Sequence, residues 1–218
     1  MKLKLVPRFE IKSFDDSDPV RFYYWPLLGR LYRERTELCL SLCNPGRRVL
    51  EVGFGSGVTF LNLNEFYDEI YGIDLTADAE GVASMYAKRG IRTFLTKGSI
   101  VETPYEPDYF DTVLLISILE HLSNIDLYKA VNEINRILKP GGQLVYGVPV
   151  HRPLTSLAFK VLGCDISKHH LSTDKDVEEA VASVMTKEKV IPFYAGAGLV
   201  GRVYEAGCFV KRSNSERS

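Results

Sequence analysis

Apolar runs of strand length alternate with amphipathic runs of helix length through the middle of the chain. The predicted strands are residues 47–53, 69–75, 91–96, 110–118 and 143–150, and the predicted helices are residues 57–66, 77–90 and 125–142. This is the pattern of consecutive βαβ units. It predicts a doubly wound, parallel sheet with helices on both faces, and it places ligands outside the carboxyl ends of the strands.

The C-terminal part of the chain departs from this alternation. Residues 152–163 and 173–188 are predicted as helices, the second with Thr173 as its N-cap. Residues 189–195 and 201–211 are predicted as two strands joined by a short glycine-containing loop. Two adjacent strands fit a closing hairpin better than a further βαβ unit.

Composition and charge exclude several classes of protein. The chain has 218 residues, 45% hydrophobic and 25% charged, which is ordinary for one globular domain. A formal charge of -1 disfavours nucleic acid and anionic membranes as partners. No apolar run has signal-peptide or membrane-spanning length, so a cytoplasmic protein without a membrane segment is expected. The four cysteines lack zinc-site spacing; Cys39 and Cys43 are expected to be buried thiols, and no metal site is predicted.

The segment VLEVGFGSGV, residues 49–58, combines glycines, which let a ligand approach the main chain, with a carboxylate. Three glycines follow the first predicted strand two residues apart: Gly53, Gly55 and Gly57. A dinucleotide fingerprint would place its third glycine at position 58, which is Val58. Glu51 would repel a pyrophosphate but would favour a cationic ligand, and S-adenosylmethionine is the positively charged cofactor that fits.

A second carboxylate supports a nucleoside ligand. Asp74 ends the next predicted strand, where βαβ nucleotide sites place an acid that accepts hydrogen bonds from ribose hydroxyls. The alternative is an aspartate that caps a helix or starts a turn. A nicotinamide-dependent oxidoreductase shares this βαβ start and remains the rival enzyme, although Glu51 and the misplaced third glycine argue against it.

Four motifs in order resemble the class I S-adenosylmethionine-dependent methyltransferases, specifically the type 11 group. They read VLEVGFGSG, IYGIDLT, GSIVETPYEPDYFDTVLLISILEHL and INRILKPGGQLVYGVP, and the resemblance is close over residues 46–150. The family fold is an α/β, doubly wound, seven-stranded and mostly parallel sheet with an antiparallel C-terminal strand. The resemblance therefore implies S-adenosyl-L-methionine as the cofactor and methyl transfer as the activity.

The resemblance also implies roles for matching residues. The first motif holds the methionine part of the cofactor, Asp74 holds the ribose, and the segment around Ser99 lies against the adenine. The predicted cofactor-binding residues are Glu51, Gly53, Gly55, Gly57, Asp74, Leu75, Ser99, Ile100 and Ile116. Many relatives carry an aspartate where this chain has Ser99, whose hydroxyl can contact the base without bringing a charge.

Two histidines are the candidate catalytic residues. His121 and His151 follow two predicted strands at their carboxyl ends, where each could act as a general base or contact the acceptor. Alternatively, His121 shapes the cofactor pocket and transfer works by alignment alone, because displacement at a sulfonium needs no obligatory catalytic group. His169 and His170 are expected to belong to a polar loop instead of a metal site.

Aromatic residues cluster near the N-terminus, at Tyr23, Tyr24, Trp25 and Tyr32. Resembled enzymes use this region as a lid over the cofactor, and the alternative is a helix that simply packs on the core. The prediction is a single domain, residues 1–218. Within it, residues 1–45 form a helical lid, 46–150 the cofactor-binding core, and 151–218 the C-terminal helices and hairpin.

Absent motifs narrow the acceptor. No Asp/Asn-Pro-Pro-Tyr segment follows the central strand, and no Pro-Cys pair offers the nucleophile of cytosine-C5 enzymes. The prediction is therefore in-line methyl transfer to a small-molecule acceptor, with no nucleic acid and no membrane as partner. A non-catalytic protein that only binds S-adenosylmethionine remains the alternative, because the motifs concern the cofactor alone.

Overall fold

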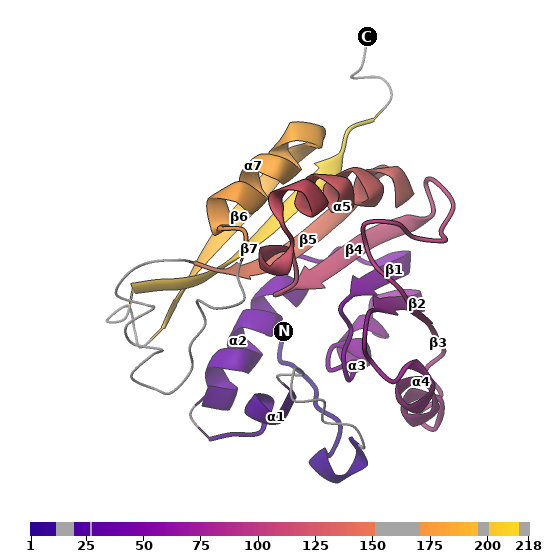
Figure 1. Ribbon diagram of the computed structural model, residues 1–218. Coiled ribbons are helices and arrows are strands. Elements are labelled where there is room, and N and C mark those ends of the chain that lie inside the picture. The colour runs from indigo at the N-terminus through magenta and orange to yellow at the C-terminus, as the bar shows by residue number, and fades with distance from the viewer. Residues whose placement is uncertain (12–19, 27, 151–170, 196–200, 214–218) are drawn as a thin grey trace.

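The computed structural model describes residues 1–11, 20–26, 28–150, 171–195 and 201–213. Its centre is a seven-stranded sheet of order β3-β2-β1-β4-β5-β7-β6 (Figure 1). The strands are β1 Gly46–Val52, β2 Tyr67–Asp74, β3 Thr93–Lys97, β4 Phe110–Ile116, β5 Leu138–Pro149, β6 Met185–Ala195 and β7 Gly201–Lys211. Strands β1 to β5 pair in parallel, whereas β7 lies antiparallel between β5 and β6. The predicted fold class, including the closing hairpin, is confirmed.

Helices cover both faces of the sheet (Figure 1). One face carries α1 Val20–Tyr23, α2 Leu28–Leu40, α3 Phe60–Leu63 and α4 Ala79–Ala87. The other carries α5 Asn124–Ile137 and α7 Asp174–Val184. Two short 3-10 helices, η1 Arg8–Glu10 and η2 Leu119–His121, complete the described elements.

Helix α5 shows why the apolar pattern produces this packing. Its apolar residues recur every three or four positions and are fully buried: Leu127, Ala130, Val131, Ile134 and Ile137. Ser123 caps the helix by accepting a hydrogen bond from the Asp126 amide, 3.2 Å away. Each buried leucine or isoleucine contributes about 1.5–3 kcal/mol to folding, so this stripe holds the helix on the sheet.

Helix α7 confirms the predicted cap but ends early. Thr173 and Asp176 form a reciprocal capping box at its start. The predicted helix 173–188 ends at Val184, because residues from Met185 onward belong to β6 and pair with β7. The sheet ladder overrides the helical propensity of this polar segment.

Two further boundaries differ from the sequence prediction. The helix predicted at 57–66 is a series of turns followed by the short α3, Phe60–Leu63. The helix predicted at 125–142 ends at Ile137, and strand β5 begins at Leu138, before Pro140 and the two glycines that were expected to stop the helix. The register of β5 with β4 shifts between Phe110 and Thr112, and this irregularity accommodates the glycines.

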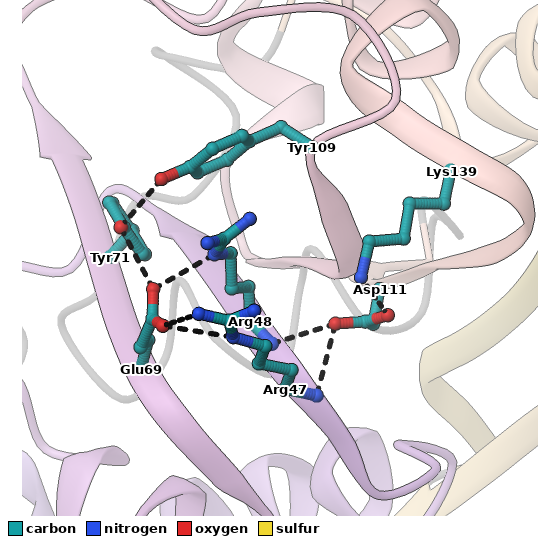
Figure 2. Close-up of polar contacts among 7 residues, drawn as sticks. All are labelled: Arg47, Arg48, Glu69, Tyr71, Tyr109, Asp111 and Lys139. Carbon is teal, nitrogen blue, oxygen red and sulfur yellow. Dashed lines mark hydrogen bonds and ion pairs between the residues drawn. The ribbon is translucent and has the colours of Figure 1, made fainter.

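A network of charged and phenolic side chains joins the amino-terminal part of the parallel strands (Figure 2). Glu69 of β2 accepts hydrogen bonds from Arg47 Nε at 3.1 Å, Arg48 Nε at 2.8 Å and the Tyr71 hydroxyl at 3.1 Å. The hydrogen bond from Arg48 is the main cause that lowers the pKa of Glu69 to about 2. This carboxylate is therefore ionised and fully partnered at neutral pH.

Asp111 of β4 continues the network (Figure 2). It accepts the backbone amides of Arg47 and Arg48 at 3.0 and 2.7 Å and the Lys139 ammonium at 2.5 Å. The amino ends of β1, β4 and β5 are thereby tied together, and their charges satisfy one another. This edge of the sheet is a stabilising one.

Some expectations concern other parts of the molecule. Cys39 and Cys43 are buried thiols, as predicted. Among the described residues, no helix combines the length and apolar character needed to cross a membrane. The helix predicted at 152–163, and His151, His169 and His170, lie outside the described residues.

Candidate cofactor and acceptor site

The carboxyl ends of the parallel strands bring the predicted site residues to one edge of the sheet. The glycine turn follows β1, Asp74 ends β2, Ser99 and Ile100 follow β3, and η2 follows β4. Strand β7 runs the other way, so its first residues reach the same edge, where Tyr204 pairs with Pro149. This edge lies opposite the saturated network of Figure 2.

The glycine turn needs the conformations that glycine provides. The φ angles of Gly53, Gly55 and Gly57 are 69°, 49° and 70°, in the left-handed region that disfavours other residues. A Cβ on Gly53 would lie 2.1 Å from Ile118 Cδ1, so the turn and the segment after β4 are in direct contact. The Gly57 amide donates to Phe54 O within the turn, and α3 begins only at Phe60, so the helix start predicted near Gly57 is wrong.

Glu51 is a buried carboxylate with little compensation. It is 4% exposed, on β1, and accepts a hydrogen bond from the Thr59 hydroxyl. Burial raises the pKa of Glu51 to about 8; the Thr59 hydrogen bond opposes this rise, and the charge of Asp74 adds to it. A nearby cation would favour the ionised form of this group, which fits the ammonium of a bound S-adenosylmethionine.

Asp74 organises the turn as well as facing the ligand edge. Its Oδ2 accepts the Gly55 amide at 2.9 Å, and its Oδ1 accepts the Thr76 and Ala77 amides at 2.8 and 3.0 Å. The Thr76 hydroxyl also lies 3.4 Å from Oδ1, so the acceptor capacity that remains is on Oδ2. Asp74 therefore has the turn-forming role that was its alternative, and its contact with a ribose stays a prediction.

The residues present fit the cofactor. Two carboxylates flank the turn, and its loops, 53–59 and 75–78, contain no lysine or arginine that would select a pyrophosphate. Of the remaining predicted contacts, Ile100 is buried, Leu75 is 64% exposed at the edge, and Ile116 packs beside the core. Ser99 lies next to Ile100, and the adjoining Gly98 amide donates to Asp74 O at 2.9 Å.

At η2 the buried ionisable side chain is that of Glu120, the neighbour of the predicted catalytic residue His121. His121 lies in η2 with an exposed side chain, whereas its neighbour Glu120 is 1% exposed. Burial raises the pKa of Glu120 to about 8, with Arg35 acting in the opposite direction. Among the described residues, the Glu120 Oε2 atom has no hydrogen-bond partner. The motif LEHL contained both residues, but sequence periodicity cannot say which side chain of a 3-10 turn points inward.

The N-terminal helices lie over this side of the sheet. Tyr23 of α1 is buried, and its hydroxyl lies 2.8 Å from the Thr36 hydroxyl of α2. Burial raises the pKa of the Tyr23 hydroxyl. Arg35 and Thr36 lower this pKa, and the charge of Glu51 raises it, so Tyr23 is close enough to Glu51 to interact with it electrostatically. Trp25 is 45% exposed.

Arg35 and Tyr204, which sequence reasoning missed, join this region from distant parts of the chain. The guanidinium carbon of Arg35 lies 3.9 Å from the ring centroid of Tyr32 and 5.5 Å from that of Tyr204. The Tyr204 hydroxyl lies 3.1 Å from Ser117 Oγ, at the end of β4. The spacing of Tyr32 and Arg35, three residues apart on one helix, was the available signal for a shared face.

Within the described part of the chain, no group of three histidine, cysteine or acidic side chains is arranged to hold a metal.

Comparison with protein families matches residues 50–146 with a methyltransferase domain, type 11. Among curated relatives, a ubiquinone biosynthesis O-methyltransferase of Paraburkholderia phymatum is 30% identical over 161 residues, which are 73% of this chain and 62% of that protein. The uncharacterized methyltransferase YcgJ of Bacillus subtilis is 32% identical over 122 residues, 53% of this chain and 47% of that protein. The chain thus spans less than two thirds of the length of these relatives.

Solved structures share the fold at low sequence identity. The N-methyltransferase NodS of Bradyrhizobium japonicum, in complex with S-adenosyl-L-homocysteine, has a TM-score of 0.66 at 19% identity and covers 93% of this chain and 95% of its own. The cyclase SpnF has a TM-score of 0.65 at 17% identity and covers 91% and 86%. The matched domain, the motif order and the fold agree: residues 50–146 of this chain form a methyltransferase domain, set in the fold that the class I S-adenosylmethionine-dependent methyltransferases share.

Proposed function

We propose that this chain transfers a methyl group from S-adenosylmethionine to a small-molecule acceptor by in-line displacement. The observation that carries the proposal is the direct contact between the glycine turn at Gly53 and Ile118 of the segment after β4. A donor held on the turn would face the groups of η2, α2 and β7 across this contact. The named relatives include O-methyltransferases, which favours a hydroxyl acceptor.

The bound cofactor would supply a methyl group on a positively charged sulfur. The chain's own residues would position it. Glu51 would pair with the ammonium, Asp74 would accept a ribose hydroxyl while holding the Gly55 amide, and Ser99 and Ile100 would lie against the adenine. Because these groups sit on strand ends and a constrained turn, they would fix the donor with little reorganisation.

The N-terminal residues would act as a lid that excludes water. Tyr23 and Tyr32 pack together with ring centroids 5.6 Å apart on the side of the sheet that holds Glu51. Excluding water would strengthen the electrostatic contacts of the site and limit competing reactions. His121 and His151 remain proposed acceptor-side residues, and alignment without a histidine base remains the alternative.

The test measures cofactor binding and turnover together. Parent protein is titrated with S-adenosylhomocysteine and then assayed for methyl transfer from S-adenosylmethionine to phenols, amines, thiols and carboxylates. Gly55→Val should abolish binding, because a β-branched residue disfavours the φ of 49° and obstructs the backbone approach. Gly90→Val is the matched control, since Gly90 has a φ of 72° at the end of α4 with no atom within 4 Å of an added Cβ.

Asp74→Ala should weaken binding of S-adenosylhomocysteine by about 1–3 kcal/mol, through the lost ribose contact and the loosened turn. If Gly55→Val and Asp74→Ala both bind like the parent, the assigned site is wrong. If the parent binds the cofactor but methylates no acceptor, the non-catalytic alternative is favoured.

A further inference from the structure

Several buried side-chain polar atoms of the described residues have no hydrogen-bond partner, and two of them lie on the α2 side of the ligand edge. One is Glu120 Oε2 in η2, and the other is Arg35 Nε in α2. Since both lack a partner, these two atoms do not bond to each other. The charges nevertheless interact, because Arg35 acts on the ionisation of Glu120.

The surroundings of the pair leave part of its hydrogen-bonding capacity open. The Arg35 guanidinium has a hydrogen bond with the Tyr23 hydroxyl and is otherwise flanked by the rings of Tyr32 and Tyr204, which offer π faces in place of carboxylate oxygens. The backbone oxygen of Glu120 accepts the Leu171 and Ser172 amides at 2.8 and 3.2 Å, so the turn is anchored through its main chain. The Glu120 carboxylate has a hydrogen bond with its own backbone, which leaves Oε2 unpartnered.

The contrast with the opposite edge is informative. There, Glu69 and Asp111 each accept several hydrogen bonds from arginine or lysine groups (Figure 2). Buried polar groups are normally satisfied in this way, and exceptions call for a specific reason. A ligand that supplies the missing partners is such a reason at Arg35 and Glu120.

The pair adjoins the place where the donor would lie. Ile118, two residues before Glu120, packs against Gly53 of the cofactor turn. Ser117 has a φ of 59°, a rare conformation for a residue other than glycine, and its side chain meets the Tyr204 hydroxyl at 3.1 Å. A Cβ on Gly147 would lie 2.5 Å from both the Tyr204 hydroxyl and Cys39 Sγ, so that glycine lets β7 and α2 approach.

We propose that Arg35 and Glu120 bind the hydroxyl of the methyl acceptor, and that the acceptor is a small molecule with an acidic hydroxyl, a phenol or an enol. Glu120 Oε2 takes the hydroxyl proton, and Arg35 donates a hydrogen bond to the oxygen that keeps the electron pair. This inference rests on the proposed methyl transfer and names its acceptor and proton acceptor.

The step balances without a further reactant. The acceptor O–H bond breaks and its proton moves to Glu120, while the oxygen forms a bond to the donor methyl carbon. The S–CH₃ bond breaks, and its electron pair neutralises the sulfonium. The proton on Glu120 then passes to solvent on product release. The cationic Arg35 stabilises an oxyanion but not a neutral amine nitrogen, so the pair favours a hydroxyl acceptor over an amine.

Other ionisable groups surround this carboxylate. Arg35 and Cys39 face the cluster from α2, and Tyr204 faces it from β7; all three are electrostatically coupled to Glu120. Burial raises the pKa of Cys39 to about 12 and that of Tyr204 well above its usual value, so neither is a base at neutral pH. Glu120, whose pKa of about 8 is the lowest of the three, is the group that can accept the proton, and its ionised fraction grows as the pH approaches 8.

The first arm of the experiment is a binding measurement that does not require turnover. Para-nitrophenol is titrated into the full chain saturated with S-adenosylhomocysteine, and the phenolate absorption band is followed against pH. The parent should bind para-nitrophenol and lower the pKa of the bound phenol. Arg35→Gln should weaken this binding at least tenfold and abolish the shift, whereas Arg30→Gln, on the exposed side of α2, should match the parent.

The second arm measures methyl transfer from S-adenosylmethionine to catechol. Glu120→Gln should lower kcat by roughly 10²–10⁴-fold and flatten the pH profile, with S-adenosylhomocysteine affinity within about twofold of the parent. Glu120→Asp should restore part of the turnover. If Glu120 had only a structural role, its replacement by glutamine would not flatten the pH profile and would not lower kcat selectively.

Each outcome decides between the two proposals. If Arg35→Gln and Glu120→Gln both behave like the parent, the inference is overturned. Methyl transfer to an amine but not to catechol also overturns the inference, but it leaves the proposed methyl transfer standing. Arginine-dependent binding of para-nitrophenol without transfer to any acceptor supports the hydroxyl subsite and overturns the proposed function. Absence of both binding and catechol methylation overturns the inference.

Discussion

Glu51 should release a proton when the cofactor binds, so cofactor affinity should depend on pH. Burial sets the pKa of this carboxyl at about 8 in the free chain, so it is largely protonated at neutral pH. The ammonium of the cofactor pairs with the ionised form. Binding therefore requires deprotonation of Glu51 over most of the physiological range.

The magnitude follows from that pKa. If only the ionised form pairs with the ammonium, the apparent Kd rises about tenfold for each unit that the pH drops below 8, and it levels off above pH 8. Between pH 6 and pH 8 the affinity should rise roughly 50-fold, and about 0.9 proton should be released per ligand at pH 7.

Calorimetric titration with S-adenosylhomocysteine provides the assay, because this ligand keeps the ammonium and lacks the sulfonium. Repeating the titration at pH 7 in buffers of different ionisation enthalpy counts the released protons. Glu51→Gln should remove the pH slope, and Glu106→Gln, at an exposed position before β4, should keep it. A parent whose affinity is flat between pH 6 and pH 8, or a glutamine variant with an unchanged slope, would refute the reasoning.

Three further predictions concern stability. The Tm of Glu120→Gln relative to that of the parent should increase as the pH rises from about 5 to 8. Burial sets the pKa of Glu120 in the folded chain at about 8, above the usual value of 4.5, so only the parent loses stability as the pH rises across that window. An equal Tm difference between variant and parent at pH 5 and at pH 8 would contradict the raised pKa of a buried Glu120 carboxyl. Thr173→Ala should cost about 1 kcal/mol by thermal unfolding, through the lost capping box of α7, with S-adenosylhomocysteine binding as the control that stays unchanged. Ile134→Ala, which removes a fully buried contact of α5, should cost about 2–5 kcal/mol in urea unfolding; a cost below 1 kcal/mol would mean that the helix is not packed as described.

The fold was predictable because its strands are buried and its motifs follow strand ends. Strand β7 occupies the predicted residues 201–211, and β1, β2 and β4 match their predictions within about two residues. Met185–Glu188 were mispredicted as helix because their pairing with β7 is a long-range contact that local propensity does not record. The helix at 57–66 was overpredicted because Gly55 and Gly57 use positive φ angles that continue the turn.

The meeting of the predicted cofactor-binding residues at one edge was predictable for the same reason, since the βαβ topology gathers strand ends there. The arrangement of α2, η2 and β7 beside them was not. Arg35 and Tyr204 stand 169 positions apart in the sequence, and their contact depends on β7 entering the sheet beside β5. The burial of Glu120 in place of His121 depends on the rotation of a single 3-10 turn, which no hydrophobic period specifies.

The insertion of β7 between β5 and β6 has a consequence for how new specificities could arise. Helix α2 packs on β5 and β7, so segments from opposite ends of the sequence meet over the sheet, outside the stretch from Gly46 to Ile116 that carries the glycine turn and Asp74. Substitutions in α2 and at the start of β7 would reshape the acceptor side while leaving that stretch intact. Chimeras that exchange both segments together between relatives should therefore retain S-adenosylhomocysteine binding, whereas exchanging one alone would mismatch the contact between Arg35 and Tyr204.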